Sequence, residues 1–310
     1  MSLDILKNAF HHLDTCDGWS LQLLNIKTSK RHGTTYNSRQ ITLSPSELID
    51  VLLKDIANIY IGNGKKSLDS YKAVREYDGT TDALTVYKLN VTNELIATEY
   101  AALLPKIADP NTETDPFEYT SAYLLKGQIQ IEDETIPVKL VSMQNPVTTL
   151  KRKYRFDNGL FKSCSEKLLS LRPTIDIFVY DNTVYFLTLA GENLFNMARS
   201  YKAVCHKNVE IVEDAQIMQG IDVFKEIAES GHNPRKFISF NPEGLAALKQ
   251  KSVRRTMALK FSIPMDSGRD KFDATVDGAS EKIVKLLCSK GMLEPFKGTA
   301  VEVESAWKWI

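Results

Sequence analysis

One segment of this chain has few structural options other than a β-hairpin. Residues 175–180 are Ile-Asp-Ile-Phe-Val-Tyr, the pair Asp181-Asn182 follows, and residues 183–189 form a second run of strand-forming residues. Two such runs, separated by two residues that tolerate left-handed backbone, are a strong short-range signal for a hairpin. The segment therefore predicts two adjacent antiparallel strands, rich enough in apolar residues to be buried.

The rest of the chain mixes strand and helix patterns. Strands are expected over residues 19–27, 34–43, 83–89, 119–131, 135–143, 151–156, 257–263 and 301–309. Helices are expected over residues 44–60, 91–108, 217–229, 241–248 and 280–290, with another that begins near residue 192. The character of the sequence changes after Pro146. We therefore predict a mixed α/β (α+β) protein of two domains, 1–148 and 149–310, each with a mixed or antiparallel sheet and flanking helices.

Charge is divided unevenly between the two halves, although the total is zero. Residues 1–150 hold 14 Lys and Arg against 19 Asp and Glu, which gives 14 − 19 = −5. Residues 151–310 hold 25 against 20, which gives 25 − 20 = +5. Within the second half, residues 232–260 carry seven Lys and Arg against one acid, Glu243. Such segregation indicates a polyanionic partner, although runs of charge are also typical of ordinary solvated surface.

Grouped cations favour contact with the phosphates of nucleic acid, because each neutralised phosphate releases counterions. If the helix after Asn241 continues through Thr256, then Lys251, Arg254 and Arg255 share one face, and the two arginines could each bind a phosphate bidentately. No recognition helix, zinc finger or stacking platform is evident, so the expected binding is independent of base sequence. The predicted DNA-binding residues are Lys151, Arg152, Lys153, Arg155, Arg235, Lys236, Lys249, Lys251, Arg254 and Arg255.

A metal-dependent nuclease is the main catalytic alternative. Such a site needs acidic residues at adjoining strand ends and a lysine near the attacked phosphate. Asp176, Asp181 and Glu192 surround the hairpin described above, and Glu134 with Lys139 lie on the earlier one. Each of these residues also fits an ordinary turn or surface position. We therefore predict no catalytic residue, no metal site and no cofactor, and expect that the protein is not an enzyme.

The cysteines and the hydropathy pattern bear on the compartment. Cys16, Cys164, Cys205 and Cys288 are scattered, with no C-x-x-C pair, which is typical of buried cysteines in a cytosolic protein. Cys205-His206 has no acidic partner nearby in the sequence and does not indicate a nucleophile. No apolar run approaches the roughly 20 residues that a membrane helix needs. A cytoplasmic location is expected.

Part of the second half resembles a known bacterial family. The segments Lys153–Phe161, residues 175–187 and Glu192–Phe195, together with the C-terminal helix pattern, are similar to the KwaB-like family of the Kiwa antiphage defence system. The resemblance implies a homodimer that binds double-stranded DNA non-specifically and blocks phage DNA replication and late transcription. It also implies recruitment to the inner face of the membrane by a KwaA-like membrane protein, and no nuclease activity. The alternative is a regulatory subunit of a membrane complex that does not bind DNA.

Overall fold

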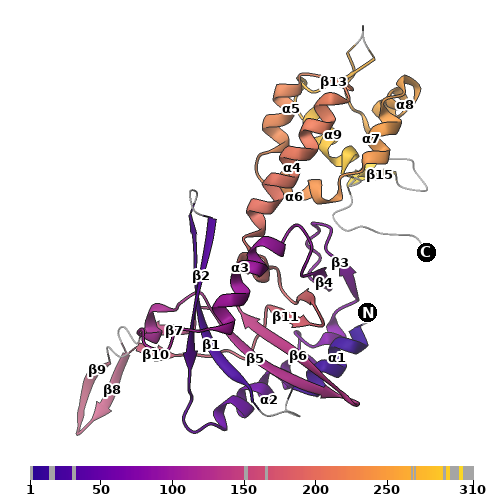
Figure 1. The fold of residues 1–310 in the computed structure, drawn as a ribbon. Coiled ribbons are helices and arrows are strands. Elements are labelled where there is room, and N and C mark those ends of the chain that lie inside the picture. Colours follow the sequence, from indigo (N-terminus) through magenta and orange to yellow (C-terminus); the bar gives the residue numbers. More distant parts are fainter. Residues whose placement is uncertain are drawn as a thin grey trace. The chain divides into compact units, whose positions relative to one another are not determined.

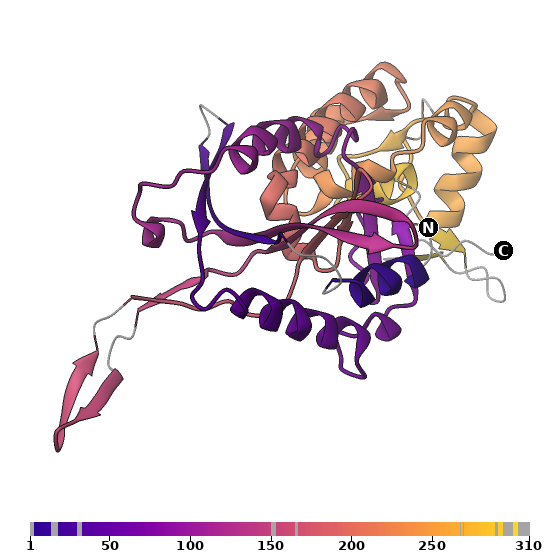
Figure 2. The same cartoon turned by 60° about the horizontal axis from the view of Figure 1, so that its bottom comes forward.

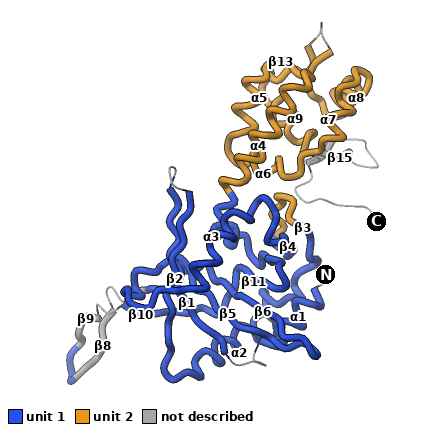
Figure 3. The backbone as a smooth tube through the Cα atoms, viewed as in Figure 1, with its two compact units in different colours: residues 1–76, 83–197 blue, residues 77–82, 198–310 orange. Residues whose placement is uncertain are grey.

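The chain forms two compact units in the computed structural model (Figure 1). The structure describes residues 3–13, 18–29, 33–149, 153–164, 167–266, 268, 270–288, 291–293 and 300–302. The first unit comprises residues 1–76 and 83–197, and the second comprises residues 77–82 and 198–310 (Figure 3). The short segment 77–82 therefore belongs to the second unit, although its neighbours in sequence on both sides belong to the first.

A mixed sheet of eight strands forms the centre of the first unit. All neighbouring strands are antiparallel except β3 and β4, which are parallel. In spatial order the strands are β2 (Gly33–Ile41), β1 (Ser20–Ser29), β5 (Ala122–Ile131), β6 (Glu134–Ser142), β11 (Ile177–Tyr180), β12 (Thr183–Phe186), β4 (Thr85–Asn90) and β3 (Ala73–Glu76). Its described residues include two further strand pairs: β7 (Val147–Thr149) with β10 (Lys167–Leu169), and β8 (Lys153–Asp157) with β9 (Leu160–Cys164).

Helices cover both faces of the eight-stranded sheet (Figure 2). The amphipathic helices α1 (Leu3–His11) and α2 (Leu48–Ile61) pack on one face, where Phe10 and Ile56 join a core with Phe178 of β11. Helix α3 (Ala97–Ala108) lies on the other face and packs against β2. Three short 3-10 helices, η1 (Leu68–Ser70), η2 (Pro116–Glu118) and η3 (Leu189–Phe195), connect these elements.

The strongest hairpin signal in the sequence is confirmed, and it lies in the first unit. Asp181 and Asn182 adopt φ values of 44° and 54°, the left-handed backbone that a two-residue turn between β11 and β12 requires. Strand β11 pairs with β6, and β12 pairs with β4. A domain boundary at residue 148 would cut through this sheet. The structure divides the chain after residue 197 instead, because hydrogen bonds join β11 and β12 to strands from the first half.

The second unit consists mainly of helices around their own core, in which Phe224, Phe237 and Phe272 are fully buried. Its helices are α4 (Met197–Asp214), α5 (Ile221–Ala228), α6 (Asn233–Lys236), η4 (Phe237–Ser239), α7 (Pro242–Leu248), α8 (Lys251–Phe261) and α9 (Ala279–Leu287). The strands among its described residues form two short pairs, β13 (Met218–Gln219) with β14 (Phe272–Asp273) and β15 (Gly291–Leu293) with β16 (Ala300–Glu302). The predicted mixed α/β class is confirmed, with most of the sheet in one unit.

Most of the segment expected as a strand over residues 257–263 is helical in the structure, because α8 continues to Phe261. Its alternating apolar residues suggested a half-buried strand, but Val253, Met257 and Phe261 recur every four residues and pack on the core of the second unit. Leu259, which the strand pattern placed inside, is 84% exposed. Across the part of the chain that the structure describes, no helix combines the length and the hydrophobicity needed to cross a bilayer.

Tyr60 fixes α2 to the residue that leads into β11, which gives a testable prediction. Its hydroxyl donates to the Ile175 carbonyl at 2.6 Å and accepts from the Ile175 N–H at 2.9 Å. Tyr60→Phe leaves both buried backbone groups without this partner, so we expect a loss of about 1–3 kcal/mol in the free energy of unfolding, measured by urea denaturation. Tyr180→Phe is the control, because Tyr180 is also a buried residue and its hydroxyl forms no hydrogen bond within the described residues. Equal losses in the two variants would contradict this role for Tyr60.

Candidate nucleic-acid interface

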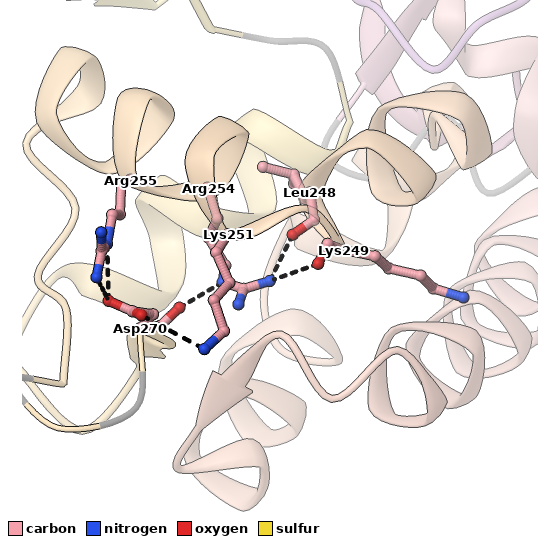
Figure 4. Close-up of polar contacts among 6 residues, drawn as sticks. All are labelled: Leu248, Lys249, Lys251, Arg254, Arg255 and Asp270. Carbon is pink, nitrogen blue, oxygen red and sulfur yellow. Dashed lines mark hydrogen bonds and ion pairs between the residues drawn. The ribbon is translucent and has the colours of Figure 1, made fainter.

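Asp270 gathers the basic residues at the start of α8 (Figure 4). Lys251, Arg254 and Arg255 do share one helix face, as their spacing predicts, and all three contact Asp270. Arg255 donates from Nε to Oδ1 at 2.8 Å, and its Nη2 lies 2.6 Å from the same oxygen. The Lys251 ammonium lies 3.7 Å from Oδ2. One carboxylate therefore faces two exposed cations.

Arg254 has a structural role instead of the predicted one. It is 5% exposed, and its Nε donates to the backbone carbonyl of Asp270 at 2.5 Å. Its Nη1 donates to the carbonyls of Leu248 at 2.6 Å and Lys249 at 3.4 Å. A guanidinium is always charged, so burial requires that its donors are bonded. Because these carbonyls already enclose it, Arg254 does not fit the predicted role of phosphate contact.

The carboxylate of Asp270 is stabilised in its charged form. The hydrogen bond from Arg255, followed by the charges of Arg255 and Lys251, lowers its pKa. Such a group stabilises the fold above its unfolded pKa, about 3.9, and this contribution is lost as the pH falls through the folded pKa. The Arg255 and Lys251 side chains are 64% and 71% exposed, so solvent screens both pairs and each contributes little to stability.

Lys249 is the predicted residue that stands clear of this cluster. It is exposed, and its side chain extends away from Asp270 (Figure 4). Its ammonium has no ion pair within the described part of the chain. Together with Lys251 and Arg255 it gives the α7–α8 corner three solvent-accessible cations, of which two contact the carboxylate of Asp270. We call Lys249, Lys251 and Arg255 the corner cations.

Arg235 and Lys236 lie on α6 and are both half-buried. The Arg235 guanidinium lies 5.6 Å from the ring centres of both Tyr77 and Tyr201, within range of a cation–π interaction. The two rings are nearly parallel, at 6°, and their hydroxyls are 2.6 Å apart. Arg235 thus packs the segment 77–82 into the second unit, a role that the sequence did not indicate.

The other predicted cluster lies in the first unit, whereas residues 235–255 lie in the second. Lys153 and Arg155 belong to β8, as the strand pattern predicted. Lys151 and Arg152 lie outside the described residues. The register sets Arg155 opposite Lys162 of β9, a cation that was not predicted. That the two clusters form one groove stays a prediction.

The acids of the nuclease alternative do not come together. Asp176 is 7% exposed, not outward-facing as expected, and its carboxylate accepts from the Met143 N–H at 2.7 Å and from the Thr188 hydroxyl. Asp181 lies at the opposite end of β11, about 16 Å of extended chain away. Glu134 and Lys139 are five residues apart on β6, which places them on opposite faces of the sheet.

Glu192, the remaining acid of that alternative, lies on η3 in the first unit. No group of three or more His, Cys, Asp or Glu side chains is arranged to hold a metal ion among the residues that the structure describes.

His206 does have acidic partners: Glu229, which lies far away in the sequence, and Glu210, one turn along α4, whose carboxylate lies 3.5 Å from Nε2. Its Nδ1 lies 2.8 Å from the Glu229 carboxylate, and this hydrogen bond raises the pKa of His206. The neighbouring Cys205 is buried, its thiol donates to the Ala228 carbonyl at 3.4 Å, and burial raises its pKa to about 12. A thiol that remains protonated is a poor nucleophile. The arrangement is therefore an exposed ion pair beside an inert cysteine.

The contrast between two adjacent arginines gives a prediction. Arg254→Ala removes hydrogen bonds from a buried charge to three carbonyls, so we expect a loss of at least about 2 kcal/mol in the free energy of unfolding. Arg255→Ala removes an exposed ion pair that solvent screens, so it should leave the free energy of unfolding nearly unchanged. Thermal and urea unfolding of both variants measure the difference. Similar stability of the two proteins would show that Arg254 does not hold the α7–α8 corner.

Comparison with known proteins identifies the family. A family model described as Kiwa protein KwaB-like matches residues 122–290, more than half of the chain. The matched region includes the hairpins β5–β6, β8–β9 and β11–β12 and the whole α7–α8 corner. No curated protein and no solved structure matches the chain. The family indicates a role in Kiwa antiphage defence. The chain therefore belongs to the KwaB-like family.

Proposed function

We propose that this protein binds double-stranded DNA through its phosphates, without sequence preference, and thereby blocks replication and transcription of phage DNA. The observation that carries the proposal is the set of corner cations, Lys249, Lys251 and Arg255, on the α7–α8 helix corner, where the carboxylate of Asp270 contacts only two of them. The corner lies within the region that matches the KwaB-like family, and that family acts in antiphage defence.

The corner cations suit phosphate binding for a physical reason. Lys251 and Arg255 share the single carboxylate of Asp270, so the three cations keep an excess of positive charge. Their exposed ion pairs are weak and can be exchanged for contacts to phosphate oxygens at little cost. Counterion release then favours the DNA complex, and it favours all base sequences about equally.

Occlusion is the mechanism that we propose, with no bond made or broken. A protein that remains bound to the duplex obstructs a polymerase, and this requires neither a metal nor a cofactor. The buried carboxylate of Asp176 and the protonated thiol of Cys205 already have structural partners, which supports a role without chemistry.

We further propose that the protein acts as a cytoplasmic homodimer, recruited to the inner face of the membrane by a KwaA-like membrane protein. The family match supports a partner within the same defence system. The acidic first half of the sequence, with its excess of five negative charges over residues 1–150, is the proposed region for dimerisation or partner docking.

The DNA proposal predicts a specific loss of affinity. Each of three single substitutions should weaken DNA binding: Lys249→Ala, Lys251→Ala and Arg255→Ala. For each variant, the loss of affinity should be the same on two unrelated duplexes, because phosphates carry no sequence information. The measurement is fluorescence anisotropy with labelled duplexes at one fixed salt concentration. The duplexes should be recovered intact after incubation with Mg²⁺ or Mn²⁺.

Lys225→Ala is the matched control, because it removes one positive charge from the same unit at a lysine already paired with Glu213 at 2.7 Å. It should leave the affinity near that of the unmodified protein. If all four variants bind equally well, the corner cations do not contact DNA. Cleavage of the duplex that Asp176→Asn abolishes would instead favour the nuclease alternative.

The partner proposal predicts co-purification. A tagged form of this protein should recover a multi-span membrane protein from detergent-solubilised membranes, and sedimentation of the purified chain should give the mass of a dimer. Recovery of that partner without any DNA binding would favour a purely regulatory subunit. A monomer that recovers no membrane protein would contradict this part of the proposal.

A further inference from the structure

The solvent-facing side of α4 carries a group of cations outside the clusters that the sequence indicated. Arg199, Lys202 and His206 are exposed and recur at intervals of three and four residues, which places them on one side of the helix. Lys207 is exposed beside His206. Residues 198–209 include no Asp or Glu. We call Arg199, Lys202, His206 and Lys207 the α4 face, and all four belong to the second unit.

The lysines and the arginine of the α4 face have no acidic partner. Arg199, Lys202 and Lys207 form no ion pair within the part of the chain that the structure describes. In the same unit, by contrast, the Lys225 ammonium of α5 lies 2.7 Å from the carboxylate of Glu213. No existing pair has to be broken before the three cations contact an anion, and each phosphate that they neutralise releases counterions.

His206 offsets two acids that border the α4 face. Its Nδ1 lies 2.8 Å from the carboxylate of Glu229, and its Nε2 lies 3.5 Å from that of Glu210. The hydrogen bond with Glu229, followed by the charges of both acids, raises the pKa of His206 and so favours its protonated form. With His206 protonated, the α4 face and these two acids together carry four positive charges against two negative ones. The surface therefore keeps an excess of positive charge.

A pocket of about 350 Å³ opens beside the α4 face. It is lined by Lys202, Cys205 and His206 of α4, Glu229 at the end of α5 and Pro234 of α6. A lysine ammonium and a protonated imidazole both donate charge-assisted hydrogen bonds to anionic oxygens. The pocket therefore offers an incoming phosphate two donors, and its acid, Glu229, is already bonded to His206.

The α4 face and the corner cations are separate surfaces of the second unit. Ion pairs connect α4 to α5, whereas the corner cations lie where α7 meets α8. Helix α9 packs against both α5 and α7, and Figure 1 shows it between α4 and the α7–α8 corner.

We infer that the α4 face is a second surface of the second unit that contacts the phosphates of duplex DNA. The inference rests on the proposed function and deepens it, because it names a contact that the corner cations do not include. From Arg199 to Lys207 the helix rises about 12 Å, at about 1.5 Å per residue. A duplex presents one phosphate per about 1.7 Å of its axis, or about seven over this length, so each cation can have a phosphate of its own.

The test removes the α4 face from the full-length protein. The α4-face variant combines Arg199→Gln, Lys202→Gln and Lys207→Gln, because glutamine is uncharged and still favours a helix. Its binding to two unrelated duplexes is measured over a range of NaCl concentrations. The slope of log affinity against log salt should become shallower by about 0.9 for each phosphate that the variant no longer neutralises, up to about 2.7 for three, and equally on both duplexes.

A charge-matched control separates local contact from net charge. Lys54→Gln, Lys65→Gln and Lys66→Gln together remove three exposed cations from the first unit, and this variant should keep the slope of the unmodified protein. An equally shallow slope in the control would show a response to net charge alone and overturn the inference. Circular dichroism of both variants confirms that a change in binding is not a loss of folding.

Failure of the inference and failure of the proposed function give different results. If the unmodified protein binds DNA and the α4-face variant binds it with the same slope, the α4 face is not a contact and the DNA proposal stands. If that variant keeps the slope but no longer recovers the membrane partner, the inference is wrong and the face belongs to the partner. If the unmodified protein does not bind duplex DNA even at low salt, the proposed function itself fails.

Discussion

The hydrogen bonds of the buried Arg254 guanidinium determine the form of the basic corner. A charge that is 5% exposed must have its donors satisfied, and here the carbonyls of Leu248, Lys249 and Asp270 accept them. These bonds connect the end of α7, the start of α8 and the loop that contains Asp270. With this arginine turned inward, its neighbours Lys251 and Arg255 remain at the surface. The most buried cation thus positions the exposed ones.

The positive charge of the second half is distributed over two different structural settings. The corner cations lie on a helix corner packed against the core of the second unit, whereas Lys153, Arg155 and Lys162 lie on a ribbon in the first unit. Arg235, between two tyrosine rings, contributes to packing instead. Cations that lie close together in the sequence therefore have different structural roles.

Local features were predictable from the sequence, and long-range partners were not. The hairpin at Asp181-Asn182 and the common face of Lys251, Arg254 and Arg255 follow from turn chemistry and helical spacing. The joining of β11 and β12 to β6 and β4 depends on pairing across many residues, which no local pattern encodes. Whether Arg254 or Arg255 is buried depends on Asp270, which follows Arg255 by 15 residues in the sequence. The Asn158-Gly159 turn was a usable signal for the ribbon, and it would have brought Lys162 into the predicted cluster.

The central claim is that phosphates, not bases, attract this protein to DNA. The most direct test is the affinity of the unmodified full-length protein for two unrelated duplexes over a range of NaCl concentrations. Our account predicts equal affinities at every salt concentration and a steep linear fall of log affinity with log salt, with a slope of about 0.9 for each phosphate contacted. An affinity that is insensitive to salt, or that differs strongly between the two duplexes, would contradict it.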